Sequence, residues 1–320
     1  MRCTEKNRCD LLRILITGGA GCLGSNLVEH YLPEGHELFV IDNFATGSAA
    51  VVPSGLDGLT VIEGSVTDSK LVDDCFHQFR PTHVIHSAAA YQDPDDWSED
   101  AQTNVVGSIN VARAAEKHNV RRLINFQTAL CYGRPDILPI PVNAPTRPFT
   151  SYGISKTAGE QFIMMSSVPT VSLRLANITG PRLSIGPIPT FYTRLKDGKG
   201  CFCSDTRRDF LDMRDFLDLM SLVMAEDAPT GVYNVSTGES SSIKDVFDVV
   251  AAYLKVEVSD VPIQPPGDDD VPAVVLDPTA TEETFGWKAK VSFKDSIETM
   301  LAWYDAHGVS AIHSHLKPTK

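Results

Sequence analysis

The sequence predicts an α/β protein with a doubly wound parallel sheet and a smaller C-terminal domain. Short apolar runs alternate with segments of helical spacing through the first half of the chain, a pattern that gives parallel strands covered by helices on both faces. From about Pro181 onward, proline and glycine become frequent and the elements become shorter. The 320 residues suffice for one large domain or two moderate ones.

The elements are expected in a regular order. Strands are predicted near 13–17, 37–41, 60–62, 83–86, 122–127 and 171–174, and helices near 24–32, 69–79, 101–118, 151–167 and 294–306. We expect residues 11–176 to form the first domain, with a returning segment near 208–240. Residues 177–320 should form the smaller domain over the carboxyl ends of the strands, where such sheets bind ligands.

Composition excludes several classes of partner and site. The net charge of −13 argues against nucleic acid or an anionic membrane. No apolar run approaches the ~20 residues of a membrane span, and the N-terminal segment lacks the apolar core of a signal peptide. Seven scattered cysteines favour a reducing cytoplasm. No metal site is expected, because neither Cys201-Phe202-Cys203 nor His313-Ser314-His315 has a second ligand pair, and Asp268-Asp269-Asp270 is expected to be a solvated loop.

Residues 12–42 carry the pattern of a dinucleotide site. A buried-strand run is followed by Gly18-x-x-Gly21-x-x-Gly24, a helix, and a second apolar run that ends at Asp42. Gly18 allows a tight turn, Gly21 lets the backbone approach a pyrophosphate, and Gly24 lets helix and strand pack closely. The helix N-terminus attracts the phosphates. Asp42 would bind the ribose hydroxyls and repel a 2′-phosphate, which favours NAD over NADP. A glycine triplet alone also occurs in surface turns, but the strand, helix and acid around this one support the dinucleotide interpretation.

A second group of residues has the pattern of an acid–base site. Tyr152 and Lys156 stand at i, i+4 and share one face of a predicted helix. A free tyrosine has a pKa near ~10, but a neighbouring ammonium and the positive charge of an oxidised nicotinamide would lower that pKa. The phenol could then take a proton from a sugar hydroxyl. Y-x-x-x-K alone is usually only a helix face; Thr128, placed after a strand, could bind the same hydroxyl and supports a catalytic role.

These motifs together resemble the extended branch of the short-chain dehydrogenase/reductase superfamily. Beside the glycine motif and Y-x-x-x-K, the chain carries D-N-x-x-x-G at 42–47, H-x-A-A at 86–89, N-V-x-G-S-x-N at 104–110, T-A-x-x-Y-G at 128–133, G-P-R at 180–182, R-D-F at 208–210 and F-G-W at 285–287. Residues 12 to about 305 are covered. The chain is most similar to NAD-dependent nucleotide-sugar 4-epimerases of the UDP-glucose/UDP-galactose type, particularly bacterial ones in surface-polysaccharide synthesis. The resemblance implies a Rossmann-type fold and bound NAD in a cytoplasmic homodimer.

The resemblance also assigns residues to cofactor and substrate. The cofactor would contact Gly18, Gly21, Cys22, Leu23, Gly24, Asp42, Asn43, Ser65, Val66, Ala88, Ala89, Asn104, Tyr152 and Lys156. The substrate would contact Tyr91, Thr128, Asn177, Arg194 and Arg208. The family uses an arginine at the position of Arg208 against the diphosphate, which suits its planar fork. Arg208 could instead form a surface Arg–Asp pair, and Arg194 could as easily be structural.

Three positions depart from the family pattern. Pro265 stands where a second phosphate-binding arginine is expected, Ser65 replaces the first aspartate of the adenine element, and Tyr91 stands where galactose epimerases carry a lysine. These departures leave the reaction type unchanged and open the choice of sugar. In the family, the residue that controls access of an N-acetyl group should lie near 271–275. The side chains there are modest in size, which favours a 2-acetamido or uronic sugar over plain UDP-glucose.

The residues after Thr128 bear on the reaction. Dehydratases of this family carry an Asp-Glu pair there and decarboxylases a nearby Glu, whereas this chain has Ala129 and Leu130. The resemblance therefore favours C4 epimerisation through a transient 4-keto sugar. The alternatives are a 4-ketoreductase or dehydrogenase on the same triad and, less favoured, a dehydratase or decarboxylase. A non-catalytic NAD sensor is a further alternative, which would be expected to lack Tyr152 or Lys156.

Two helical segments suggest a dimer. Residues 104–118 and 152–165 have apolar side chains on more than one face, including Val105, Ile109, Ala112, Phe162 and Met165. One face would meet the sheet, and the other could pair with a second copy as a four-helix bundle, as in the family's dimers. The alternative is simply a well-buried helix pair.

Overall fold

The fold is built on one seven-stranded parallel sheet. The computed structural model describes residues 11–53, 55–257, 260–267 and 270–309. The strand order is β11-β6-β5-β4-β1-β2-β3, and every neighbouring pair is parallel. The strands are β1 (Arg13–Thr17), β2 (Glu37–Asp42), β3 (Leu59–Glu63), β4 (His83–His86), β5 (Arg122–Thr128), β6 (Thr170–Leu175) and β11 (Gly231–Val235). The predicted doubly wound fold and its first six strands are confirmed.

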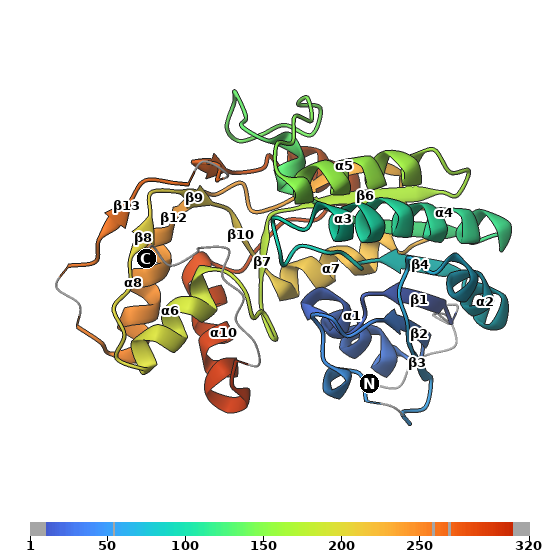
Figure 1. Ribbon diagram of the computed structural model, residues 1–320, viewed down its shortest axis with the longest axis horizontal. Helices are drawn as coiled ribbons and strands as arrows, with labels where there is room; N and C mark the ends of the chain where they lie inside the picture. Colours follow the sequence, from blue (N-terminus) through green and yellow to red (C-terminus); the bar gives the residue numbers. More distant parts are fainter. Residues whose placement is uncertain (1–10, 54, 258–259, 268–269, 310–320) are drawn as a thin grey trace.

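Helices cover both faces of the sheet (Figure 1). Because side chains alternate along a strand, Ile14 and Ile16 face one core with α1 and α7, while Leu15 faces the other with α2, α4 and α5. A π-helical segment, η3, joins α3 to α4. The bounds are α1 (Cys22–Tyr31), α2 (Ser69–Phe79), α3 (Trp97–Asp100), η3 (Ala101–Val106), α4 (Gly107–Lys117), α5 (Ser151–Met164) and α7 (Met213–Val223).

A smaller part packs beside the sheet, around helices α6, α8 and α10 (Figure 1). Its elements are α6 (Pro187–Lys196), α8 (Ile243–Leu254), α10 (Phe293–His307), β7 (Asn177–Thr179), β8 (Cys203–Ser204), β9 (Arg207–Arg208), β10 (Phe210–Asp212), β12 (Ser241–Ser242), β13 (Ile263–Gln264) and β14 (Ala273–Val274). Short 3-10 turns complete the chain at η1 (Leu32–Glu34), η2 (Ala49–Val51) and η4 (Ala129–Tyr132).

The chain returns to the sheet after the first segment of the smaller part. Helix α7 packs in the core of α1, and β11 pairs with β6 at the edge of the sheet. The α9 helix (Thr279–Phe285) then contacts β11. The returning segment expected near 208–240 thus corresponds in the structure to 213–235, whereas 207–208 lies in a small separate sheet.

The topology defines where a ligand would bind. Strand β1 lies between β2 and β4, so the chain leaves β1 toward one side of the sheet and later returns on the other side. In open α/β sheets, ligands bind beyond the carboxyl ends of the strands at such a switch point. The loops after β1 and β4 and the end of β5 meet there.

Candidate active site

Two glycines of the first loop are required by the chain itself. Gly18 has φ of +70°, and a Cβ there would lie 2.7 Å from the Cα of Ala88. A Cβ on Gly24 would lie 2.3 Å from the carbonyl oxygen of Gly18. At Gly21, by contrast, a Cβ would meet only that oxygen, at 3.4 Å. The small size of Gly21 therefore leaves room for a ligand close to the backbone, as expected for a pyrophosphate.

The start of α1 is suited to an anion. The helix begins after Gly21, and no side chain caps its first N–H groups. The Cys22 thiol donates to the carbonyl of Pro181 at 3.4 Å, and burial raises the pKa of this thiol to about 12, so the thiol stays neutral and would not repel an anion at the helix N-terminus. Leu23 is half-buried beside Cys22. The amide of Asn26 also donates to Pro181, which ties the loop to the smaller part.

Asp42 is held where a ribose would be recognised. Its carboxylate is buried at the end of β2 and accepts the N–H of Ala20 and the N–H of Phe44, both at 2.8 Å. Each oxygen keeps a further lone pair for a hydroxyl donor. The neighbouring Asn43 is exposed and accepts the N–H of Ala45.

The segment expected to contact the adenine, residues 65–68, also forms hydrogen bonds within the protein. The Ser65 hydroxyl hydrogen-bonds that of Thr67 at 2.9 Å, and Asp68 caps α2 by accepting two backbone N–H groups. Val66 is buried against Gly107, where a Cβ would lie 2.5 Å from it. Ser65 thus stands beside a second hydroxyl, that of Thr67, rather than beside a carboxylate.

A buried relay of hydrogen bonds fixes the loop after β4. The N–H of Ala88 donates to the hydroxyl oxygen of Thr17 at 3.3 Å, and this hydroxyl contacts Nδ1 of His86 at 2.8 Å. Nε2 of His86 contacts the hydroxyl oxygen of Ser108 at 3.0 Å, and Ser108 donates to the carbonyl of Asn104 at 2.6 Å. Burial lowers the pKa of His86 to about 3, so the ring is neutral. Since Ser108 donates elsewhere, Nε2 carries the proton, and the histidine of H-x-A-A is a structural support.

Asn104 also holds the loop that follows β4. Its side chain is buried, accepts the N–H of Ala90 at 2.9 Å, and donates to the carbonyl of Ala90 and to the hydroxyl of Ser155. It thereby holds the 88–91 loop in which Ala88 and Ala89 are half-buried. Asn104 thus supports the 88–91 loop through hydrogen bonds to the backbone of Ala90.

The three predicted acid–base residues come together at the ends of β5 and α5. Tyr152 lies in the first turn of α5, and its hydroxyl hydrogen-bonds Thr128, the last residue of β5. Lys156 follows one turn later, and its Nζ donates to the carbonyl of Phe126 at 2.6 Å. The Gln127 amide joins the two elements, because it donates to the carbonyl of Lys156 and accepts the N–H of Thr128. No motif in the sequence pointed to Gln127, although it lies beside Thr128.

Burial shifts the pKa values of both Lys156 and Tyr152. Burial lowers the pKa of Lys156 to about 8. The pKa of Tyr152 is raised above its ordinary value, first by burial and then by Tyr91 and Asp100, while the Thr128 hydrogen bond opposes the rise. The lowering expected from the lysine ammonium together with an oxidised nicotinamide concerns the protein with its cofactor bound and stays a prediction.

Tyr91 lies against the phenol. The two rings meet edge to face with centroids 6.3 Å apart, and the Tyr91 hydroxyl hydrogen-bonds Thr46 in the loop after β2. Tyr91 thus connects the loop beside Asp42 to the site of Tyr152.

The predicted substrate arginines have different surroundings. Arg208 forms an ion pair with Asp270 and donates to the carbonyl of Val271 at 2.8 Å. Arg194 donates twice to the carbonyl of Gly200 just beyond the end of α6, which matches its structural alternative. Asn177 is exposed, and its amide donates to the backbone carbonyl of Asp209.

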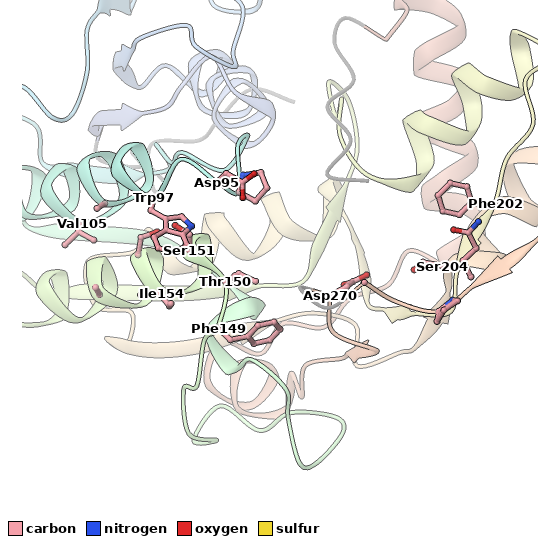
Figure 2. A pocket seen from close by; sticks show the side chains of 17 residues that line it. Asp95, Trp97, Val105, Phe149, Thr150, Ser151, Ile154, Phe202, Ser204 and Asp270 are labelled. Carbon is pink, nitrogen blue, oxygen red and sulfur yellow. The ribbon is translucent and has the colours of Figure 1, made fainter. Parts of the chain in front are cut away.

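A cavity of about 870 Å³ separates the start of α5 from the smaller part. Figure 2 shows Thr150 and Ser151 on one wall, Phe202 and Ser204 across from them, and Asp270 between the two sides. The residue before Tyr152 and the partner of Arg208 therefore border one space. Of the 271–275 loop, Val271 and Val274 are buried in a core with Tyr132, so their side chains do not line this cavity.

The described residues contain no metal site, disulfide or membrane-spanning helix. No three His, Cys, Asp or Glu side chains gather there as metal ligands, and the five cysteines among these residues are free thiols. None of the helices described is both long and apolar enough to cross a membrane. His313, His315, Asp268, Asp269, Cys3 and Cys9 lie outside the described residues.

Comparison with known proteins identifies the family. The family model described as "NAD dependent epimerase/dehydratase family" matches residues 14–236. The chain belongs to this family. The resemblance to extended short-chain dehydrogenases/reductases is thereby confirmed.

Members of known structure and sequence are similar over almost the whole chain. The Bordetella bronchiseptica enzyme WbmG, solved with NAD, is 68% identical with a TM-score of 0.92, covering 98% of this chain and 100% of that one. WbmG has also been solved with NAD and UDP. The UDP-glucose 4-epimerase of Mycolicibacterium smegmatis is 27% identical over 314 residues, 92% of this chain and 98% of the relative. UDP-arabinose 4-epimerase 1 of Arabidopsis thaliana is 28% identical over 337 residues, 92% of this chain and 80% of the relative.

Proposed function

We propose that this family member is an NAD-dependent UDP-sugar 4-epimerase. The observation that carries the proposal is the hydrogen-bonded pair Thr128–Tyr152, with Lys156 one turn away, at the switch point of a sheet whose first loop fits a dinucleotide. Relatives named as UDP-sugar 4-epimerases support the reaction, and WbmG solved with NAD and UDP supports the cofactor and the nucleotide.

The chain's own residues would supply binding and proton transfer. Gly21, the N-terminus of α1 and Asp42 would hold NAD, whose bound nicotinamide supplies a reversible hydride acceptor. Tyr152 would take the proton of the C4 hydroxyl while Thr128 binds the same oxygen. After the 4-keto sugar has rotated to present its other face, Tyr152 would return the proton to the C4 oxygen as the hydride comes back to C4, which then has the opposite configuration. Net redox is zero.

The negative charge of the substrate's diphosphate calls for cationic and N–H donor groups on the protein. Arg208 would meet the diphosphate, since guanidinium binds phosphate through paired N–H groups. Asn177 lies exposed on β7, where it could donate to the sugar or the diphosphate. We propose that the substrate carries a 2-acetamido or uronic sugar, as in the biosynthesis of a surface polysaccharide. Plain UDP-glucose is the alternative substrate.

Epimerisation is preferred to elimination on the residues after β5. Ala129 and Leu130 begin the 3-10 turn after Thr128, so no carboxyl group stands at these positions to protonate a departing hydroxyl. A 4-ketoreductase or dehydrogenase on the same triad remains the second candidate. It would exchange its cofactor at each turnover, whereas an epimerase regenerates it.

We also propose a cytoplasmic homodimer. Phe162 and Met165 at the end of α5 are 43% and 77% exposed, and Ile154 nearer its start is 51% exposed. Apolar side chains on one exposed helix face favour a second copy as partner, in the four-helix arrangement of helices 101–117 and 151–164.

The deciding experiment follows both product and cofactor. Purified protein is incubated with UDP-glucose, UDP-GlcNAc and UDP-GlcNAcA, products are resolved by NMR, and nicotinamide absorbance is recorded throughout. A C4 epimer formed without stoichiometric NADH is expected, and Tyr152→Phe should abolish it. Stoichiometric NADH with a ketone product would instead establish the dehydrogenase. Turnover of UDP-glucose alone would refute the preference for an acetamido or uronic sugar.

A further inference from the structure

Three contacts join α5 to the helical segment 97–117 in register. Asp100 accepts the hydroxyl of Ser151, and Asn104 donates to the hydroxyl of Ser155 at 3.0 Å. At the third level a Cβ on Gly159 would lie 2.2 Å from the carbonyl oxygen of Asn104 and 2.8 Å from the hydroxyl of Ser108, so the helices touch there through backbone. The contacts on α5 fall at 151, 155 and 159, four residues apart.

The residues that follow the first two contacts are those of the proposed chemistry. Tyr152 follows Ser151, and Lys156 follows Ser155. The opposite segment carries Asn104, which holds the loop of Ala88 and Ala89 through Ala90. These contacts therefore set the distance between the phenol and the loop expected to line the cofactor.

Asp100 is the charged member of the series. It is 2% exposed, closes α3, and lies where the π-helical η3 begins. Its carboxylate stands at the N-terminus of α5, whose dipole favours a negative charge. Because Ser151 and Tyr152 occupy the first turn of α5, a displacement of that turn would move the phenol directly.

We propose that Asp100 is a positioning residue: its contact with Ser151 fixes the first turn of α5 and thereby the hydroxyl of Tyr152 against the cofactor loop. The inference rests on the proposed epimerase function and adds a residue to it. No motif of the sequence analysis contains Asp100.

A test must separate the positioning effect of Asp100 from the effect of its charge on Tyr152, so the groups that face these two residues matter. Tyr152 is faced by Asp100, by the hydroxyl of Tyr91 and by the hydroxyl of Thr128. Asp100 is faced by the hydroxyl of Ser151 and by the acids Asp93, Asp96 and Glu99 of its own segment. Glu99 is exposed and does not act on Tyr152, so Glu99→Gln is a matched control that removes one negative charge from the adjacent position.

The experiment compares Asp100→Ala, Asp100→Asn, Ser151→Ala and Glu99→Gln in the NAD-loaded protein. Asp100→Ala should lower kcat roughly 10- to 100-fold, in the range expected for a misplaced reacting group, with the Kd for UDP changed less than about twofold. Asp100→Asn keeps an acceptor for Ser151 and should restore most of kcat. It should also move the acid limb of the kcat–pH profile to lower pH, because removing a negative charge beside a phenol lowers its pKa. Glu99→Gln should change neither kcat nor the profile.

Ser151→Ala removes the partner without touching the charge and keeps the inference testable if Asp100→Ala does not fold. It should lower kcat as Asp100→Ala does, and the double variant should add little further loss. Equal activities of Asp100→Ala and Glu99→Gln, or additive losses in the double variant, would overturn the inference. If the wild-type protein epimerises no nucleotide sugar, the proposed function fails instead. The phenolate absorbance of Tyr152, taken as a difference from Tyr152→Phe, should still titrate at lower pH in Asp100→Asn.

Discussion

Glu160→Gln tests the packing beneath the candidate site. The Glu160 carboxylate lies one turn beyond Lys156 on α5 and is 4% exposed. It accepts Nη2 of Arg174 at 2.8 Å and the hydroxyl of Ser172 at 2.6 Å. The Arg174 side chain is itself 10% exposed and also donates to the hydroxyl of Tyr132 at 2.9 Å. This buried pair joins α5 to β6 under the turn that follows β5.

The expected magnitude follows from what the substitution leaves behind. Glutamine has nearly the volume of glutamate, so no cavity forms, but the guanidinium of Arg174 loses its counter-charge while remaining buried. Breaking a buried pair in this way costs about 3–5 kcal/mol. With an unfolding entropy of about 2 cal/mol/K per residue, each kcal/mol lowers the Tm of a 320-residue chain by about 1.5 °C, so we expect a fall of about 4–7 °C. The pKa of Lys156, which Glu160 raises, should fall further below its ordinary value.

The measurement is chemical and thermal unfolding at pH 7 with saturating NAD in all samples. Glu298→Gln is the matched control, because its i, i+4 partner Lys294 lies 3.7 Å away and the two side chains are 39% and 68% exposed. An exposed pair contributes about 0–1 kcal/mol, so this control should hardly change Tm. Removing both buried charges in Glu160→Gln/Arg174→Met should recover part of the loss. Equal stabilities of Glu160→Gln and Glu298→Gln would refute the reasoning.

Three further predictions test the cofactor loop, the proposed dimer and a buried histidine. Gly24→Ala should abolish retention of NAD on purification, since the added Cβ would lie 2.3 Å from the backbone oxygen of Gly18. Gly200→Ala is the control and should retain NAD, because no atom lies within 4 Å of a Cβ added there. Phe162→Glu should give a monomer in sedimentation equilibrium, whereas Leu222→Glu, at a residue 41% exposed on α7, should not; a wild-type monomer would contradict the dimer. His86 has a folded pKa of about 3 against 6.5 when unfolded, so the unfolded chain binds more protons between these values and stability should fall as pH drops from 6.5 toward 3. Urea midpoints at pH 7 and 5 should show this slope, and His86→Gln should make it shallower; an unchanged slope would contradict the assignment.

The parts of the fold that sequence predicted well depend on local pattern. The first six strands could be placed because each is a short apolar run bounded by turn residues. The glycine loop could be interpreted because strand, helix and acid lie within one stretch of chain. Strand β11 was not predicted as a separate strand, since Gly231–Val235 acquires its role only by pairing with β6, which is distant in sequence.

The parts of the site that sequence could not give depend on distant partners. Nothing in R-D-F indicates that Arg208 pairs with Asp270, 62 residues further along the chain. The Asp100–Ser151 contact likewise requires the two helical segments to be packed before it can be recognised. The pKa of Tyr152 depends on burial and on Tyr91 and Asp100, and spacing along one helix specifies none of these.

The electrostatics of Tyr152 connect these observations to the proposed reaction. Burial, Tyr91 and Asp100 all raise the pKa of the phenol, and only the Thr128 hydrogen bond acts against them. The chain alone therefore keeps the phenol protonated and unable to act as a base at neutral pH. A positive charge that arrives with a ligand would favour the phenolate, and in a site of low polarity its effect exceeds that of the same charge in water. Proton abstraction would then depend on an oxidised nicotinamide beside Tyr152, which couples the removal of the proton to the presence of a hydride acceptor.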